Sequence, residues 1–97
     1  MEPVKRIDIV IAEVALAELT TLLARHSVGG YTVTRGLSGL GDRGAQPGDG
    51  LAGEFSNAAV LVVCQQAQIS DLMSDLRALL KRFGGLCLQS DALWLKH

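Results

Sequence analysis

Hydrophobic and polar residues follow two different periods in the first third of the chain. Isoleucine occupies every second position of Ile7–Ile11, which predicts a half-buried strand. Over Ala12–His26 the apolar residues recur three and four positions apart, which predicts an amphipathic helix. Gly29 and Gly30 are expected to end that helix, since glycine tolerates a left-handed backbone. Tyr31–Thr34 is rich in β-branched and aromatic residues and predicts a second strand.

The second half of the chain repeats the alternation of strand and helix. Phe55–Cys64 is a nearly continuous apolar run, the pattern of a strand covered on both faces. Ile69–Phe83 has the most regular helical spacing in the chain, and Gly84 and Gly85 are expected to stop it. Leu86–Leu95 predicts a last strand with weaker alternation.

The resulting order, βαββαβ, predicts an α+β fold of the ferredoxin-like kind in a single domain, residues 1–97. We expect a four-stranded, mostly antiparallel sheet with both helices on one face and with the first and third strands in the centre. The chain is 48% hydrophobic, more than a small monomer needs, and 97 residues bury too little surface for ample stability alone. The uncovered sheet face is therefore expected to meet another subunit.

Residues 36–53 differ from the rest of the chain because seven of the 18 positions are glycine. We expect a long flexible loop at about 38–53, of the kind that is usually functional. Gly39–Gly44 matches G-x-G-x-x-G, but Pro47 and the residues around it cannot begin the helix that a dinucleotide fold requires. What remains is a weaker hypothesis, that backbone N–H groups of the loop hold a phosphate.

Charge and composition exclude several classes of protein. The net charge is −1 and only 20% of the residues are charged, which argues against nucleic-acid binding. The four aromatic residues do not form the stacking surface of an RNA-recognition module. Charged or turn residues interrupt every apolar run before the roughly 18 residues that a membrane span requires. The first residues do not resemble a signal peptide, so we expect a cytoplasmic protein.

Residues suited to catalysis or metal binding are few and scattered. His26 lies on the apolar stripe of the first helix and is expected to be structural, with no carboxylate at i+4 or nearby to orient it. Cys64 and Cys87 are 23 positions apart and are expected to be buried free thiols. We expect no metal site and no enzymatic activity. The remaining candidates are His97 and the loop carboxylates Asp42, Asp49 and Glu54, which are expected to be solvated.

Several segments resemble the PII signal-transduction family over essentially the whole chain. Lys5–Ile11 resembles the opening strand of that family, and Gly30–Thr34 followed by Gly39–Gly41 resembles its second strand and the base of its T-loop. Val62 and Val63 before the second helix, and Gly84–Gly85 at the B-loop position, extend the likeness. The resemblance implies a ferredoxin-like homotrimer that binds adenine nucleotides between subunits and signals to a protein target through the T-loop.

The same resemblance assigns the nucleotide-binding residues. Thr32 would hydrogen-bond the adenine, with the backbone of Val62 at the base of the cleft. The B-loop side would come from the neighbouring subunit, and Lys81, Arg82 and Arg43 would balance the phosphate charge. The predicted nucleotide-binding residues are Thr32, Gly39, Leu40, Gly41, Asp42, Val62, Gly84, Gly85 and Leu86.

The chain also departs from the family pattern. No lysine follows Gly85 where nitrogen-regulatory members contact a γ-phosphate, which favours ADP or AMP over ATP. Arg43 stands where the family has a T-loop glutamine, which makes Arg43 the candidate contact for bicarbonate or another small anion. The family's C-terminal arginines have no counterpart before His97, and residues 36–53 contain no tyrosine to modify.

Short members of this kind resemble PII-like proteins associated with carboxysomes and inorganic-carbon uptake. The hypothesis is therefore a trimeric sensor of ADP or AMP, with bicarbonate as a second ligand to test, that regulates an unidentified partner through residues 38–53. Two alternatives stay open. One is another trimeric ferredoxin-like protein that binds a small metabolite or metal, and the other is a protein-interaction module without nucleotide.

Overall fold

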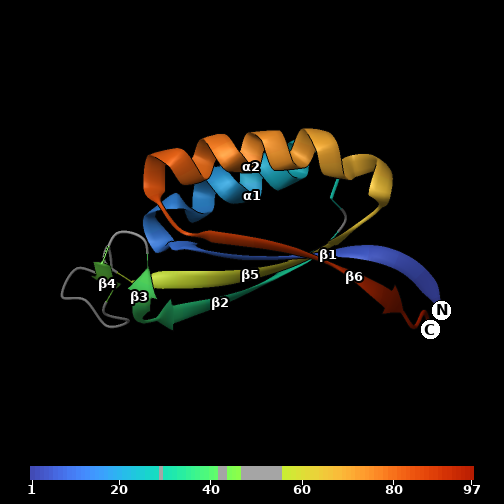
Figure 1. Ribbon diagram of the computed structural model, residues 1–97, viewed down its shortest axis with the longest axis horizontal. Helices are drawn as coiled ribbons and strands as arrows, with labels where there is room; N and C mark the ends of the chain where they lie inside the picture. Colours follow the sequence, from blue (N-terminus) through green and yellow to red (C-terminus); the bar gives the residue numbers. More distant parts are fainter. Residues whose placement is uncertain (29, 42–43, 47–55) are drawn as a thin grey trace.

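The computed structural model describes residues 1–28, 30–41, 44–46 and 56–97. Two helices lie side by side on one face of a four-stranded antiparallel sheet (Figure 1). The strands of this sheet follow the order β2-β5-β1-β6. The predicted ferredoxin-like fold is confirmed, including the central position of the first and third predicted strands. The elements are β1 (Glu2–Ala12), η1 (Glu13–Ala15), α1 (Leu16–Arg25), β2 (Tyr31–Leu37), β3 (Gly39–Gly41), β4 (Gly44–Gln46), β5 (Asn57–Cys64), η2 (Gln66–Gln68), α2 (Ile69–Phe83) and β6 (Leu86–Trp94).

The core lies between the helices and the central strands β1 and β5. Their register places Ile7 opposite Val62 and Ile9 opposite Val60, and these four side chains are almost completely buried. The leucines of α1 and α2 cover them from the helix side. The buried cluster consists of Ile7, Ile9, Ile11, Ala15, Leu16, Leu19, Leu22, Leu23, Ala58, Val60, Val62, Cys64, Leu72, Leu76 and Leu79.

Among the described residues, no helix lies over the opposite face of the sheet (Figure 1). Alternate residues of a strand point to opposite faces, so Leu61 and Leu88 lie on this open face and are 37% and 55% exposed. The helices therefore cover one face of the apolar Phe55–Cys64 run, as expected from both helices lying on one side of the sheet. Cover of its second face by another subunit stays a prediction.

The first helix ends earlier than the sequence suggested. It stops at Arg25, and Ser27 rather than a glycine adopts the left-handed conformation, with φ 58°. The N–H of Ser27 donates to the carbonyl of Ala24, and the N–H of Val28 donates to that of Leu23. This pair of bonds is a Schellman motif, and it satisfies carbonyls that a helix end would otherwise leave unpaired.

The glycine-rich segment contains more regular structure than we expected. β2 extends to Leu37, and Gly39–Gly41 pairs with Gly44–Gln46 in a two-stranded antiparallel sheet beyond the end of the main sheet (Figure 1). Backbone hydrogen bonds define this local pairing. A prediction from the hydrophobic pattern does not detect it, because the segment is mostly glycine and polar residues. The remainder of the predicted loop lies outside the described residues.

Other features agree with the sequence. α2 spans Ile69–Phe83 as predicted, and Gly84, with φ 75°, follows it. Both cysteines are free thiols; Cys64 is buried as expected, whereas Cys87 is only partly buried, and burial raises the pKa of both. Within the described ranges, neither helix is long and apolar enough to cross a bilayer.

The backbone at Gly85 leaves no room for a side chain. Its φ is +118°, and a Cβ there would lie 2.4 Å from the carbonyl oxygen of Val10. We therefore expect Gly85→Ala to lower the free energy of unfolding by about 1–3 kcal/mol, the usual cost of such backbone strain. Urea unfolding at fixed protein concentration, followed by circular dichroism, measures this.

Gly30→Ala is the matched control for that experiment. A Cβ at Gly30 would meet nothing within 4 Å. Its midpoint should stay at the wild-type value or rise slightly, because alanine restricts the unfolded chain more than glycine does. Equal midpoints for the two variants would show that the Gly85 backbone is not under this constraint.

Candidate functional site

The base of the glycine-rich loop and the turn after α2 lie at the same end of the molecule. In Figure 1 the β3–β4 hairpin extends from the end of the sheet where α2 finishes and β6 begins. β1 also ends there, since Val10 pairs with Leu86 and Ala12 pairs with Asn57. The topology therefore places the predicted T-loop base and the predicted B-loop side of the cleft at one end of the fold.

A bulge marks the point where β2 leaves the main sheet. Thr34 pairs with Ala59 and Leu37 pairs with Asn57, so two residues of β2 stand opposite one residue of β5. Gly36 occupies the bulge with a φ of 73°, a conformation that suits glycine. An isolated glycine inside a strand is the sequence signal for such a bulge. The predicted strand ended at Thr34 and therefore missed it.

Gly84–Leu86 forms a tight turn against the end of β1. The N–H of Gly84 donates to the carbonyl of Leu80 at 2.7 Å, and Gly85 packs its backbone on Val10. Leu86 begins β6 on the open face of the sheet and is 49% exposed. The turn thus presents backbone and one apolar side chain, a surface that a ligand can approach closely.

Thr32 and Val62 occupy different environments. Thr32 is exposed on the open face of β2, opposite Leu61 of β5. Val62 is fully buried toward the helices, and its backbone lies between Tyr31 of β2 and Ile7 of β1. The two residues are therefore neighbours across the β2–β5 pair. The side chain of Thr32 lies on the open face of the sheet, and that of Val62 lies on the helix-covered face.

The predicted site residues are divided between the two edges of the sheet. Thr32 lies on edge strand β2, and Gly85 and Leu86 lie at the start of edge strand β6. Three strand spacings separate those edges, roughly 14 Å at about 4.8 Å each. Gly39, Leu40 and Gly41 belong to β3, whereas Asp42 and Arg43 lie outside the described residues. One chain consequently brings the loop base and the turn after α2 to the same end of the fold but does not gather the described site residues around one point.

The G-x-G-x-x-G match has no dinucleotide-binding geometry. Its last glycine, Gly44, begins strand β4 and not a helix. In the part of the chain that the structure describes, no group of three or more histidine, cysteine, aspartate or glutamate residues could hold a metal.

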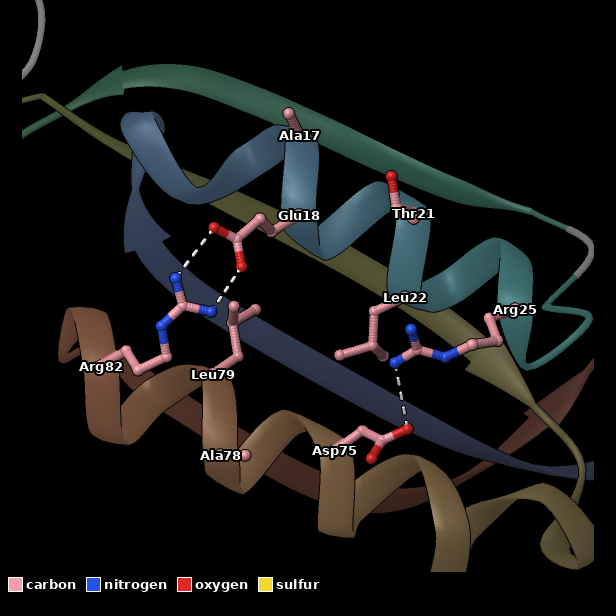
Figure 2. Close-up of a pocket in the computed structure, with 9 residues that line it drawn as sticks. All are labelled: Ala17, Glu18, Thr21, Leu22, Arg25, Asp75, Ala78, Leu79 and Arg82. Carbon is pink, nitrogen blue, oxygen red and sulfur yellow. Dashed lines mark hydrogen bonds and ion pairs between the residues drawn. The ribbon is translucent and has the colours of Figure 1, made fainter.

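Arg82 is already paired within the chain. Its guanidinium donates to both carboxylate oxygens of Glu18, at 2.7 and 3.1 Å, across a groove of about 460 Å³ between α1 and α2 (Figure 2). Arg25 closes the same groove through Asp75 at 3.3 Å. Within one chain the charge of Arg82 is therefore matched by Glu18 on the helix layer, and its role in balancing phosphate charge stays a prediction.

The expectation that His26 lacks a nearby carboxylate is wrong. Nε2 of His26 lies 2.6 Å from Oδ2 of Asp75, which is 49 positions away in sequence but faces the end of α1 from α2. The side-chain amide of Gln68 donates to the carbonyl of His26 at 3.2 Å. These contacts tie the end of α1 to α2, so His26 has the structural role that we expected, with a partner that helical spacing could not reveal.

Comparison with known proteins identifies the family. The fold and the loop base are those of a ferredoxin-like domain with a hairpin between its second and third main strands. The family model for nitrogen regulatory protein P-II matches residues 4–90, which is most of the chain. The chain belongs to the P-II family, as its sequence resemblance implied. No curated protein matches the chain.

Solved structures of low sequence identity share the fold. CPII from Thiomonas intermedia K12, a nitrogen regulatory PII-like protein solved with ADP, AMP and bicarbonate, is 23% identical with a TM-score of 0.86 over 93% of this chain and 86% of CPII. Its complex with ADP and bicarbonate gives 23% identity and a TM-score of 0.83 over the same shares. Its apo form gives 19% identity and a TM-score of 0.75 over 93% of this chain and 89% of that one.

The contact between His26 and Asp75 predicts a dependence of stability on acid pH. The hydrogen bond from His26 is the main reason why the pKa of Asp75 lies below its ordinary value, and Arg25 lowers it further. A lowered pKa in the folded state stabilises the fold above the ordinary aspartate pKa, and this stabilisation is lost as the pH falls through the lowered value. We expect the difference in unfolding free energy between wild type and Asp75→Asn to shrink from about pH 5 to about pH 3.

Urea unfolding at each pH measures that difference. Asp71→Asn serves as the control, since it removes a carboxylate from the first turn of the same helix. The acid loss of stability should persist in Asp71→Asn and be reduced in Asp75→Asn. If Asp75→Asn loses stability with acid as steeply as wild type does, the contact does not contribute in solution.

Proposed function

We propose that this chain is a PII-like signalling protein, a homotrimer that binds ADP or AMP in clefts between subunits. The match to the P-II family over residues 4–90 is the observation that carries the proposal. The likeness to CPII, solved with ADP, AMP and bicarbonate, supports the choice of ligands. Binding would alter the T-loop, residues 38–53, and thereby a protein partner in inorganic-carbon metabolism, in the cytoplasm or at the carboxysome.

The division of the predicted residues between two sheet edges supports a cleft built by two chains. If the β2 edge of one subunit lies beside the β6 edge of the next, Thr32 meets Gly84, Gly85 and Leu86 of the neighbour. Such an interface joins unlike edges, and it forms a closed ring when the rotation between copies allows. Val62 would lie at the base of each cleft, and Gly39, Leu40, Gly41 and Asp42 would approach the ribose and phosphates.

The open sheet face supports assembly. Its exposed apolar residues are large, and monomeric proteins seldom leave such a patch uncovered. The charged pair on this face is matched internally, because Arg6 binds Asp8 through two contacts of 3.0 and 3.2 Å. A partner could therefore cover the pair without leaving a lone charge. The exposed large apolar residues of the face are Leu61, Leu86, Leu88 and Trp94.

A charge placed on the open face should prevent assembly. We expect wild type to sediment as three chains and Leu88→Glu as one chain of 10.3 kDa. The reason is that burial of an unpaired carboxylate costs more free energy than the interface can offset. Leu93→Glu is the control, since Leu93 is equally large and exposed but lies on the other face of the same strand. Analytical ultracentrifugation measures both, and an unchanged Leu88→Glu assembly would contradict the use of this face.

Titration calorimetry with AMP, ADP and ATP tests the ligand. We expect saturation near one adenine nucleotide per chain and no heat with guanine nucleotides. Thr32→Val keeps the shape of the side chain and removes its hydrogen bond, so adenine affinity should fall about fivefold to tenfold, the effect of roughly 1 kcal/mol. Absence of heat and of a thermal shift with every adenine nucleotide would refute the sensor and favour a protein-interaction module or another small-metabolite binder.

The same titration with and without bicarbonate tests the second ligand. Arg43→Ala should weaken any bicarbonate effect while leaving assembly intact, since guanidinium binds oxyanions through paired hydrogen bonds. A bicarbonate effect that survives this substitution would show that Arg43 is not the anion contact.

A further inference from the structure

The end of β1 is connected to both ends of the glycine-rich segment. The backbone N–H of Glu13 donates to the carbonyl of Ser56 at 2.8 Å, which adds one step to the β1–β5 ladder beyond Ala12 and Asn57. The carboxylate of the same residue accepts the backbone N–H of Gly36 at 3.2 Å. Gly36 begins the segment and Ser56 lies just after it, so one residue contacts the chain at both sides of the segment.

The bulge in β2 explains why Gly36 is available to Glu13. Two residues of β2 stand opposite one residue of β5 at this point, so one N–H is displaced from the ladder. A displaced backbone N–H needs another acceptor. Glu13 Oε2 accepts it. Glu13 is the first residue of η1, directly after β1, and its side chain is only 18% exposed.

Charge at the bulge is matched as well. Arg35, the other residue of the bulge, lies 3.7 Å from Oε1 of Glu13 and is 70% exposed. The carboxylate thus contacts both bulge residues, Gly36 through a hydrogen bond and Arg35 through a looser ion pair. The ion pair contributes little in water, so the hydrogen bond to Gly36 is the contact that fixes geometry.

We propose that Glu13 is the positioning residue of the T-loop base. It holds the start of the segment, at Gly36, in a fixed relation to its end, at Ser56, and so sets the backbone position from which Gly39–Gly41 reaches the ligand. The inference deepens the proposed function, on which its ligand-binding part rests. Glu13 acts through Gly36 and Ser56 and does not itself contact the nucleotide.

Two variants separate the hydrogen bond from the charge. Glu13→Ala removes both, whereas Glu13→Gln removes the charge and keeps an acceptor for the Gly36 N–H. Both variants are neutral at this position, so the difference between them excludes the charge and reports the loss of the acceptor together with the apolar stem that carries it. Glu18→Ala is the matched control, since Glu18 pairs with Arg82 on the helix layer.

Amide hydrogen exchange of the unliganded assembly, measured by NMR, tests the positioning directly. We expect the Gly36 amide to exchange at least about tenfold faster in Glu13→Ala than in wild type, and protection to return in Glu13→Gln. The amide of residue 13 should also exchange faster in Glu13→Ala, because the two ends loosen together. Glu18→Ala should leave both amides unchanged. Equal exchange of Gly36 in wild type and Glu13→Ala would overturn the proposal.

Calorimetry with ADP tests the consequence. We expect ADP affinity to be about fivefold to tenfold lower in Glu13→Ala than in Glu13→Gln, the effect of one hydrogen bond, and unchanged in Glu18→Ala. Equal ADP affinities in Glu13→Ala and Glu13→Gln, with a loosened Gly36, would overturn the link to the ligand. If wild type binds no adenine nucleotide, the proposed function fails, and the exchange result still decides whether Glu13 positions the loop base.

Discussion

The pairing of β1 with β5 is the constraint on which the other features of the structure depend. Its register puts isoleucines of one strand opposite valines of the other on a single face, and that face is buried by α1 and α2. A shift by one residue would turn all of these side chains to the uncovered face. The same register fixes which residues of β2 and β6 flank the pair, and it brings Glu13 opposite Ser56 at the end of the ladder.

Coverage by helices on one face leaves the second face of the same strands exposed. Both faces of β5 are apolar, but the part of the chain that the structure describes covers only one of them. This imbalance is why we interpret the open face as an interface, which the apolar sequence of the strand also led us to expect. An apolar run reports that a strand is buried on both faces in the assembled protein, without saying whether the covering layer belongs to the same chain.

The helices and strands that the sequence predicted well are those whose apolar residues recur with a regular period. α2 was predicted to the residue because leucines mark its buried stripe and glycines follow its end. The missed parts depend on backbone geometry or on long-range contacts. Ser27 takes the left-handed conformation at the helix end, where the sequence predicted a glycine. Asp75 lies 49 positions from His26, and Glu13 contacts Gly36 across a sequence separation of 23. No local periodicity records such pairs.

Half of the described residues of the candidate site are glycines, so the site depends strongly on the course of the backbone. At 23% identity the TM-score is 0.86, so the shared fold needs few identical side chains. The turn at Gly84 and Gly85 and the bulge at Gly36 are defined by φ angles and by close packing. A ligand recognised through such backbone groups requires their relative positions to be fixed, although glycine alone fixes nothing. The rigidity must come from neighbouring contacts, from Val10 against Gly85 on one sheet edge and from Glu13 at Gly36 toward the other.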